Sequence, residues 1–215
     1  MYTPNQFSET RLEVLHSLIR SKPLATLVTL DADGLVANHI PLYLRLDGSP
    51  RGTLVGHVAR ANPLWRDTDT ATQVLAIFQG PDAYISPSWY ATKQEHGKVV
   101  PTWNYAVVQA RGTLTVMDDP VWIRAQLLDL THQQEAAFAK PWAVDDAPRD
   151  YTDKMLAALV GIEIPISQLT GKWKVSQNQP PVNQAGVVQG LGATGGDDAG
   201  TMAGLVKQYG AVAGE

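Results

Sequence analysis

Short β-rich segments separated by tight turns place the strongest limit on how this chain folds. Residues 24–30 read LATLVTL and are followed by Asp33-Gly34, a pair typical of hairpin turns, and by a second apolar stretch at residues 35–46. After a turn at residues 47–50, further β-rich segments lie at residues 53–58, 73–78, 105–117 and 159–166, with a short extended piece at 172–175. Because few helical segments intervene, the pattern favours an antiparallel barrel over repeated βαβ units. We therefore expect a mainly β fold with flanking helices.

Before the tail, the longer helical signals lie in three places. Residues 12–19 carry an apolar stripe at helical spacing that must end before Pro23. Asp119-Pro120 is a typical helix start, with an N-cap side chain followed by proline at the first helical position. A third helix is expected to begin near Asp150. These helices are too few to cover both faces of a parallel sheet.

The tail contains GLGATG at residues 190–195, which matches the GxGxxG dinucleotide fingerprint. That fingerprint works only inside a βαβ unit, and no second apolar strand follows it here. We therefore reject a Rossmann interpretation and expect a flexible linker at residues 191–200. The predicted organisation is one barrel domain at residues 1–190, followed at 191–215 by a Gly/Ala-rich linker and a short C-terminal helix.

Composition narrows the function classes. The chain has 215 residues, an apolar content of 44% and no cysteine, which excludes disulfides, thiol nucleophiles and cysteine-based metal sites. The net charge of −4 and the scattered basic residues argue against nucleic-acid binding through phosphate neutralisation. The five histidines show no metal-ligand spacing. Without a signal sequence or a stretch of about 20 apolar residues, a cytoplasmic protein with no membrane contact is expected.

The run from Tyr84 to Tyr105 is unusually rich in aromatic and charged side chains. It reads YISPSWYATKQEHGKVVPTWNY and is too irregular for a single strand or helix. Aromatic faces beside lysines suit a ligand that is both flat and charged. The alternative is a long connection whose aromatics only plug the side of the barrel.

Two further clusters have related chemistry. In HVARANP at residues 57–63, Asn62-Pro63 is typical of a helix start, whose free N–H groups attract anions, and Arg60 lies beside it. The alternative is a capped turn with a solvated arginine. In GKWKVSQN at residues 171–178, lysines flank a tryptophan and precede hydroxyl and amide groups. That pattern also suits a solvated edge strand protected by lysine.

Together these clusters resemble the PaiB-type FMN-binding negative transcriptional regulators, a family of FMN-binding split barrels. The matching blocks extend over roughly residues 1–190, with Ala91-Thr92 standing where the family pattern leads us to expect Pro-Ser. The blocks are MYTP with Phe7, HVARANP, GPDAYISPSWY, VPTWNY, GIE at 161–163 and KWKVSQN. The resemblance implies an antiparallel, Greek-key-like FMN-binding split β-barrel. It also implies a homodimer that holds FMN in two clefts at the subunit interface.

The resemblance also implies roles for particular residues. Arg60 and Asn62 would hold the phosphate, with Lys93 or Lys174 as supplementary charge. Ser176, Gln177 and Asn104 would serve the ribityl chain and the polar edge of the ring, while Trp103 or Tyr105 would cover its face. The remaining site residues implied are Thr26, His57 and Thr102. No catalytic residue and no metal ligand is assigned.

Three functions of different classes remain open. The first is an FMN-binding negative regulator of transcription, which contacts DNA directly or through another protein, although no helix-turn-helix pattern is visible. The second is a flavin-dependent oxidoreductase that uses NAD(P)H. The third is a haem-handling split barrel, for which His39, His57 or His96 would be the nitrogen ligands.

Overall fold

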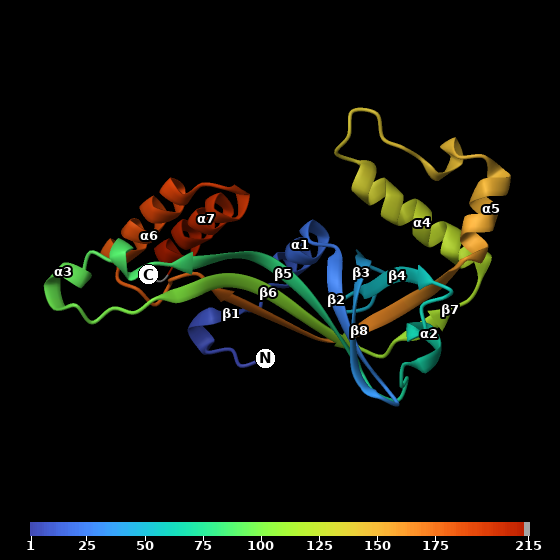
Figure 1. Ribbon diagram of the computed structural model, residues 1–215, viewed down its shortest axis with the longest axis horizontal. Coiled ribbons are helices and arrows are strands. Elements are labelled where there is room, and N and C mark those ends of the chain that lie inside the picture. The colour runs from blue at the N-terminus through green and yellow to red at the C-terminus, as the bar shows by residue number, and fades with distance from the viewer. Residues whose placement is uncertain (213–215) are drawn as a thin grey trace. The chain divides into compact units, whose positions relative to one another are not determined.

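The computed structural model describes residues 1–212, and these form two compact units (Figure 1). Unit 1 comprises Met1–Leu18, Gln79–Val108 and the chain from Thr170 onward, and unit 2 comprises Ile19–Phe78 and Gln109–Leu169. Three long strands, β5 (Val74–Ile85), β6 (Thr102–Gly112) and β8 (Leu159–Lys174), each begin in one unit and end in the other.

Unit 2 is built on a closed ring of antiparallel strands. Its remaining strands are β2 (Leu24–Asp31), β3 (Gly34–Arg45), β4 (Thr53–Ala59) and β7 (Thr115–Met117). The strand order is β8-β4-β3-β2-β5-β6, and β6 pairs again with β8, while β7 pairs separately with β8. At this closure a Cβ on Gly112 would lie 2.2 Å from the Pro165 carbonyl oxygen, so the two backbones approach too closely for a side chain. The predicted antiparallel barrel is therefore present.

The core of this ring comes from alternating positions along the strands. In β2, Ala25 and Leu27 are fully buried while Leu24 is exposed, as expected for a strand with one face inward. Leu42, Leu54, Phe78 and Ile162 fill the same interior from four other strands. Burial of these side chains supplies the main driving force for closing the ring.

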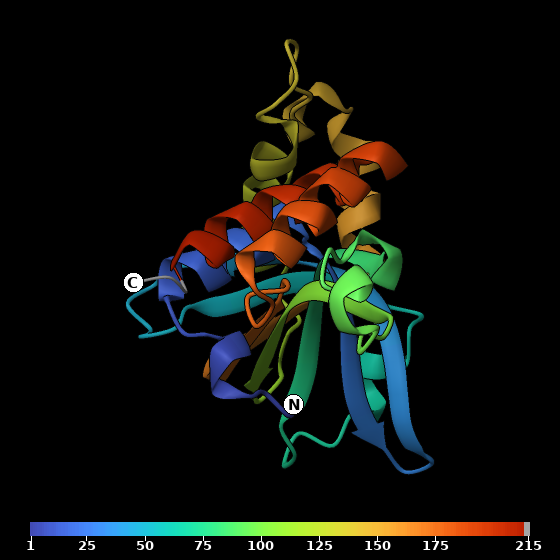
Figure 2. The same ribbon diagram turned by 90° about the vertical axis from the view of Figure 1, so that its left-hand side faces the viewer.

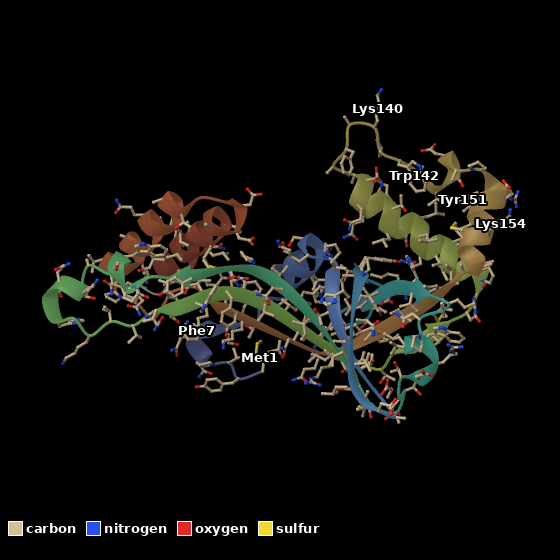
Figure 3. All side chains as sticks on the ribbon, in the orientation of Figure 1. Met1, Phe7, Lys140, Trp142, Tyr151 and Lys154 are labelled. Atoms are coloured by element: carbon tan, nitrogen blue, oxygen red, sulfur yellow. The ribbon has the colours of Figure 1, made fainter. Side chains whose placement is uncertain are left out.

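Helices flank the strands of unit 2 and confirm two of the sequence predictions. Asp119 caps α4 (Pro120–Glu135) by accepting a hydrogen bond from the Val121 N–H, with Pro120 at the first position. The helix predicted near residue 150 is α5 (Arg149–Ala157). The remaining helical pieces of the unit are α2 (Leu64–Asp67) and η3 (Val144–Asp146). Trp142 and Tyr151 stand exposed on this part of the chain (Figure 3).

Unit 1 contains the other ends of the three long strands together with most of the remaining helices. Its further elements are η1 (Asn5–Phe7), β1 (Ser8–Glu9), η2 (Pro87–Trp89), α3 (Lys93–His96), α6 (Pro181–Thr194) and α7 (Asp197–Val212), and α1 (Leu12–Ser21) belongs to it as far as Leu18. Helices α6 and α7 lie side by side over one face of the strands (Figures 1 and 2). Met1 and Phe7 lie on the opposite side (Figure 3).

The C-terminal region corrects the sequence prediction. Residues 191–194 complete α6, and the stretch from 197 to 200 opens the 16-residue helix α7, where a flexible linker was expected. Only Gly195 and Gly196, with φ of 75° and 91°, connect the two helices. Glycine and alanine favour a linker when considered alone, but here their small side chains allow close packing. The last three residues of the predicted tail, 213–215, lie outside the described part of the chain.

A second correction concerns β8, which was expected as two separate pieces at 159–166 and 172–175. It runs without interruption from Leu159 to Lys174. Gln168 and Thr170 interrupt the apolar pattern, which is why the sequence predicted two pieces. The strand nevertheless continues through them, from unit 2 into unit 1. One strand therefore carries residues of both units.

Candidate functional site

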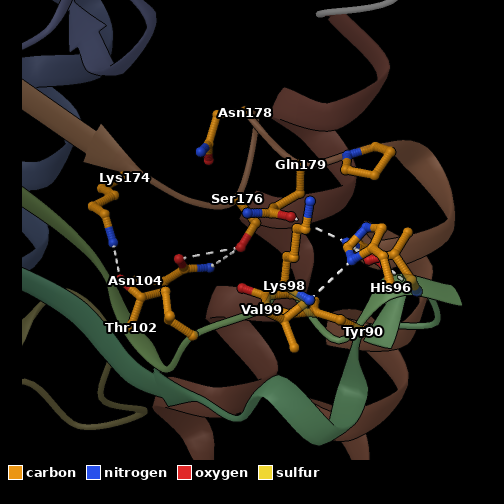
Figure 4. A pocket seen from close by; sticks show the side chains of 14 residues that line it. Tyr90, His96, Lys98, Val99, Thr102, Asn104, Lys174, Ser176, Asn178 and Gln179 are labelled. Carbon is orange, nitrogen blue, oxygen red and sulfur yellow. Dashed lines mark hydrogen bonds between the residues drawn. The ribbon is translucent and has the colours of Figure 1, made fainter. Parts of the chain in front are cut away.

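A cavity of about 360 Å³ lies within unit 1 and is lined mainly by polar side chains (Figure 4). Its walls come from the segment after η2, the start of β6, the end of β8 and the start of α6. The lining residues are Tyr90, Thr92, His96, Lys98, Val99, Val100, Thr102, Asn104, Lys174, Ser176, Asn178, Gln179, Pro180 and Asn183. No aspartate or glutamate belongs to this lining. The cavity therefore favours a polar, anionic ligand.

Asn104 and Ser176 form a buried pair in this cavity. The Asn104 Nδ2 donates to the Ser176 Oγ at 2.9 Å, and the Oγ lies 3.2 Å from the Asn104 Oδ1, to which it can donate in turn. The two residues are only 1% and 3% exposed. Ser176 also has a φ of 66°, a left-handed conformation that is rare for a side-chain-bearing residue. Such strain is typical of functional sites, since the surrounding structure must impose it.

Lys174 enters the cavity from the end of β8. Its Nζ donates to the Thr102 Oγ1 and, at 2.6 Å, to the Trp103 carbonyl oxygen. Burial lowers the pKa of Lys174, and the positive charge of Lys172 lowers it further. Lys174 has no carboxylate partner among the described residues. An anion at this point would supply the missing counter-charge.

The opposite wall is a short segment around α3 that is tied to α6. The His96 Nδ1 accepts a hydrogen bond from the Lys98 N–H at 3.0 Å, which fixes the backbone at Lys98. Asn183 on α6 is 2% exposed. It accepts from the Thr92 N–H at 3.2 Å and donates to the Thr92 Oγ1 at 2.9 Å. The start of α6 therefore holds this wall of the cavity in place.

Tyr90 contributes a hydroxyl group without a protein partner. Its side chain lines the cavity and is 4% exposed, and burial raises its pKa. No hydrogen bond from this hydroxyl to another described residue is present. The Tyr90 hydroxyl is not among the enclosed polar atoms that lack a partner, so it stays accessible to a ligand in the cavity.

The structure brings four of the predicted site residues together in this cavity. They are Thr102, Asn104, Lys174 and Ser176. Three others from unit 1 face elsewhere. Trp103 is 54% exposed and contacts Tyr84 edge to face at 5.9 Å, while Lys172 lies over the Tyr105 ring at 5.2 Å. Lys93 donates to the Ser88 Oγ at 3.3 Å outside the lining.

Gln177 has a structural contact beside the cavity. Its Oε1 accepts from the Val175 N–H at 2.8 Å and its Nε2 donates to the Trp173 carbonyl oxygen at 2.6 Å. These bonds fix the turn in which Ser176 takes its left-handed conformation. Gln177 thus supports the position of its neighbour.

The predicted residues of unit 2 have protein partners of their own. Arg60 donates to both carboxylate oxygens of Asp118, at 3.0 and 2.5 Å, and to the carbonyl oxygens of Ala157 and Leu159. These contacts raise the pKa of Arg60, with the Asp118 hydrogen bond as the main cause. A phosphate at Arg60 would therefore have to compete with Asp118.

The remaining predicted site residues of unit 2 are Asn62, His57 and Thr26. The Asn62 Oδ1 accepts from the Leu64 N–H at 3.0 Å, but Pro63 and not Asn62 is the N-cap, and the helix that follows is a single turn of four residues. The His57 Nδ1 lies 2.8 Å from the Gln126 Oε1, and burial lowers the pKa of His57. Thr26 is half-buried in β2. A cavity of about 120 Å³ beside Asn62 contains Asp31 and Asp67, which disfavours an anion.

Several lining residues were missed by the sequence analysis. Tyr90, His96 and Lys98 lie inside the aromatic run that was singled out, so their residue types were visible without their roles. Asn178 and Gln179 directly follow the predicted Ser176 and Gln177, and adjacency could have suggested them. Asn183 gives no local signal, because its role depends on α6 meeting a segment about 90 residues earlier.

Relatives with known sequences cover almost all of the chain. A protein of Emericella nidulans is 34% identical, with 98% of each chain covered. The Bacillus subtilis "Protease synthase and sporulation protein PAI 2" is 28% identical, with 96% of this chain and 97% of the relative covered. The similarity therefore includes the cavity as well as the barrel.

Solved structures agree on the fold. A FAD- and haem-binding protein of Mycobacterium smegmatis has a TM-score of 0.56 at 21% identity, covering 78% of this chain and 73% of that chain. The flavocytochrome Anf3 of Azotobacter vinelandii has a TM-score of 0.55 at 12% identity, covering 78% and 69%. At these identities the likeness concerns the fold alone, and it confirms the predicted split-barrel class.

Residues 1–168 match the family described as "Putative FMN-binding domain". Together with the PAI 2 relative, this match confirms the family resemblance predicted from the sequence. The chain belongs to this PaiB-type family of FMN-binding domains.

Proposed function

We propose that this protein binds FMN and that the cavity of unit 1 receives part of the cofactor. The observation that carries the proposal is the convergence of Thr102, Asn104, Lys174 and Ser176 on one polar cavity. Its volume of about 360 Å³ lies within the range of known ligand sites. Membership of the family supports the same cofactor.

The residues of the cavity suit the polar half of a flavin nucleotide. Asn104 and Ser176 satisfy each other in this structure, and both can exchange that bond for the hydroxyl groups of a ribityl chain. Lys174 offers positive charge and several donors. Bound FMN would supply a ring that accepts electrons.

Binding of FMN can be measured by flavin fluorescence during titration. We expect the wild-type protein to bind FMN and Ser176→Ala to bind about tenfold more weakly, because one hydrogen bond to the ligand is lost. Ser88→Ala is a matched control in the same unit outside the cavity, and its affinity should equal that of the wild type. A wild-type protein that fails to bind FMN would refute the proposal.

We further propose that the protein acts as a homodimer and as a negative regulator of transcription, with FMN held at the subunit interface. Family membership and the similarity to PAI 2 along nearly the whole chain support this proposal. Light scattering measures the mass, and a monomer would contradict the dimer.

A gel-shift assay at several salt concentrations tests the regulatory role. We expect a shift that is specific to an operator fragment of the organism's own genome, in the presence of any partner protein that co-purifies. No specific shift, combined with flavin-dependent oxidation of NAD(P)H, would favour an oxidoreductase instead.

A further inference from the structure

The cationic side chains of this protein differ in whether a carboxylate already neutralises them. Arg60, the arginine predicted to bind phosphate, is paired with Asp118 through two hydrogen bonds and also contacts two backbone carbonyls. Lys98 and Lys174 line the cavity, and neither has a carboxylate partner in the part of the chain that the structure describes. Within the cavity, the positive charge available to a ligand therefore comes from these two lysines.

The surroundings of these lysines strengthen the contrast. The protein has 21 acidic residues and a net charge of −4, yet no acidic residue lines the cavity. His96 and the unpartnered hydroxyl of Tyr90 line it as well, and both can donate hydrogen bonds to an anion. In Figure 4, Lys174 and Lys98 lie on opposite sides of the Asn104–Ser176 pair. The polar pair is thus placed between two positive charges.

The side chain of Lys98 is placed to bind a negative charge and is not needed for the fold. Its side chain is exposed, and its backbone N–H is fixed by the His96 Nδ1 at 3.0 Å. The ammonium group can therefore reach a bound anion while its attachment point stays in place. Because the side chain makes no hydrogen bond or ion pair with another described residue, its removal should leave the structure intact.

We propose that Lys98 is a specificity-determining residue that, together with Lys174, binds the phosphate monoester of the ligand. This inference rests on the proposed FMN function and goes beyond it, because it assigns the phosphate to the cavity of unit 1 rather than to Arg60. It follows that the protein selects FMN over riboflavin, which has the same ring and ribityl chain but no phosphate. Arg60 then serves the structure of unit 2.

The experiment compares the affinities of FMN and riboflavin in wild type, Lys98→Gln, Arg60→Ala and Lys207→Gln. Lys207 is an exposed lysine of α7 outside the cavity and is the matched control. We expect Lys98→Gln to weaken FMN binding about tenfold while riboflavin binding is unchanged, as for the loss of one charge-assisted bond. Arg60→Ala should leave the ratio of the two affinities unchanged. Equal ratios in wild type and Lys98→Gln, or a ratio that collapses only in Arg60→Ala, would overturn the assignment.

Inorganic phosphate separates this inference from the proposed function. We expect millimolar phosphate to shift the amide NMR signals of Lys98, Thr102 and Ser176 in wild type, and to shift them much less in Lys98→Gln. This result would support the anion site even if no flavin bound, in which case only the proposed function would fail. Phosphate that leaves these signals unmoved would refute the anion site whether or not FMN binds.

Discussion

A buried carboxylate near the N-terminus ties the two ends of unit 1 together. Glu9 is 5% exposed and accepts hydrogen bonds from the Arg11 guanidinium at 3.0 and 2.5 Å and from the Tyr209 hydroxyl at 2.5 Å. Burial alone would raise the pKa of Glu9, but the bonds from Arg11 and Tyr209 outweigh it and lower the pKa from 4.5 to about 2. The folded protein therefore holds this side chain ionised where the unfolded chain would bind a proton.

This shift predicts a loss of stability in acid. Because the pKa of Glu9 is lower in the folded state, its contribution is complete above about pH 4.5 and is lost as the pH falls toward 2. Urea unfolding at pH 7 and at pH 3 measures the difference in unfolding free energy. In Glu9→Gln that difference should be smaller than in wild type, since no proton is taken up at this position. An unchanged difference would contradict the assignment.

Tryptophan-to-helix packing decides the position of α6. A Cβ on Gly190 would lie 2.2 Å from the Trp89 Cδ2, so the indole ring occupies the space that a side chain would need. Gly192, two residues further along the same helix, has no atom within 4 Å of such a Cβ. The two glycines look alike in the sequence but have opposite surroundings.

The pair gives a matched prediction. Gly190→Ala should lower the free energy of unfolding by about 1–3 kcal/mol, because the added methyl group displaces Trp89. Gly192→Ala should raise it by up to about 1 kcal/mol, because alanine is the better helix former and meets no obstacle. Thermal unfolding of both variants is the measurement, and equal effects would show that Trp89 does not rest on α6 as described.

The contact between Trp89 and Gly190 also shows which helices and strands could be predicted from the sequence and which could not. Turn chemistry at Asp33-Gly34 and capping at Asp119-Pro120 are local, so the bounds of β2 and β3 and the start of α4 were predicted closely. The tail was wrongly predicted as a linker, because glycine has a low helix propensity and its value at Gly190 appears only when Trp89 packs against it. Helix propensity therefore gives the wrong prediction where a side chain distant in the sequence determines the local conformation.

At the scale of the whole molecule, unit 1 is assembled from three stretches of chain that the stretches of unit 2 separate. The residue types of the cavity were recognisable at Asn104, Lys174 and Ser176, since their blocks resemble a known family. Lys98 and Asn183 were not, because their parts in the site depend on segments about 90 residues apart meeting in space. The residue types of the cavity were recognisable from the sequence, but the meeting of these residues in one cavity was not.

A ligand held by residues 90–104 and 174–183 joins two separate stretches of unit 1 and should therefore stabilise their packing. At a free FMN concentration 100 times its Kd, linkage predicts an increase of about 2.7 kcal/mol in unfolding free energy. For a chain of this size that corresponds to a rise in Tm of roughly 5–11 °C. Thermal unfolding with FMN, and with riboflavin at the same concentration as control, measures it. A Tm that does not respond to saturating FMN would contradict binding to the folded state alone.

The lining of the cavity comes from residues 90–104 and 174–183, and the second range is synthesised late. A ribosome has completed every strand of the barrel and most of the chain before Asn183 is made. A nascent chain therefore cannot form the finished cavity, and the cofactor cannot load there, before Asn183 has been made. Contacts between such distant segments also form slowly.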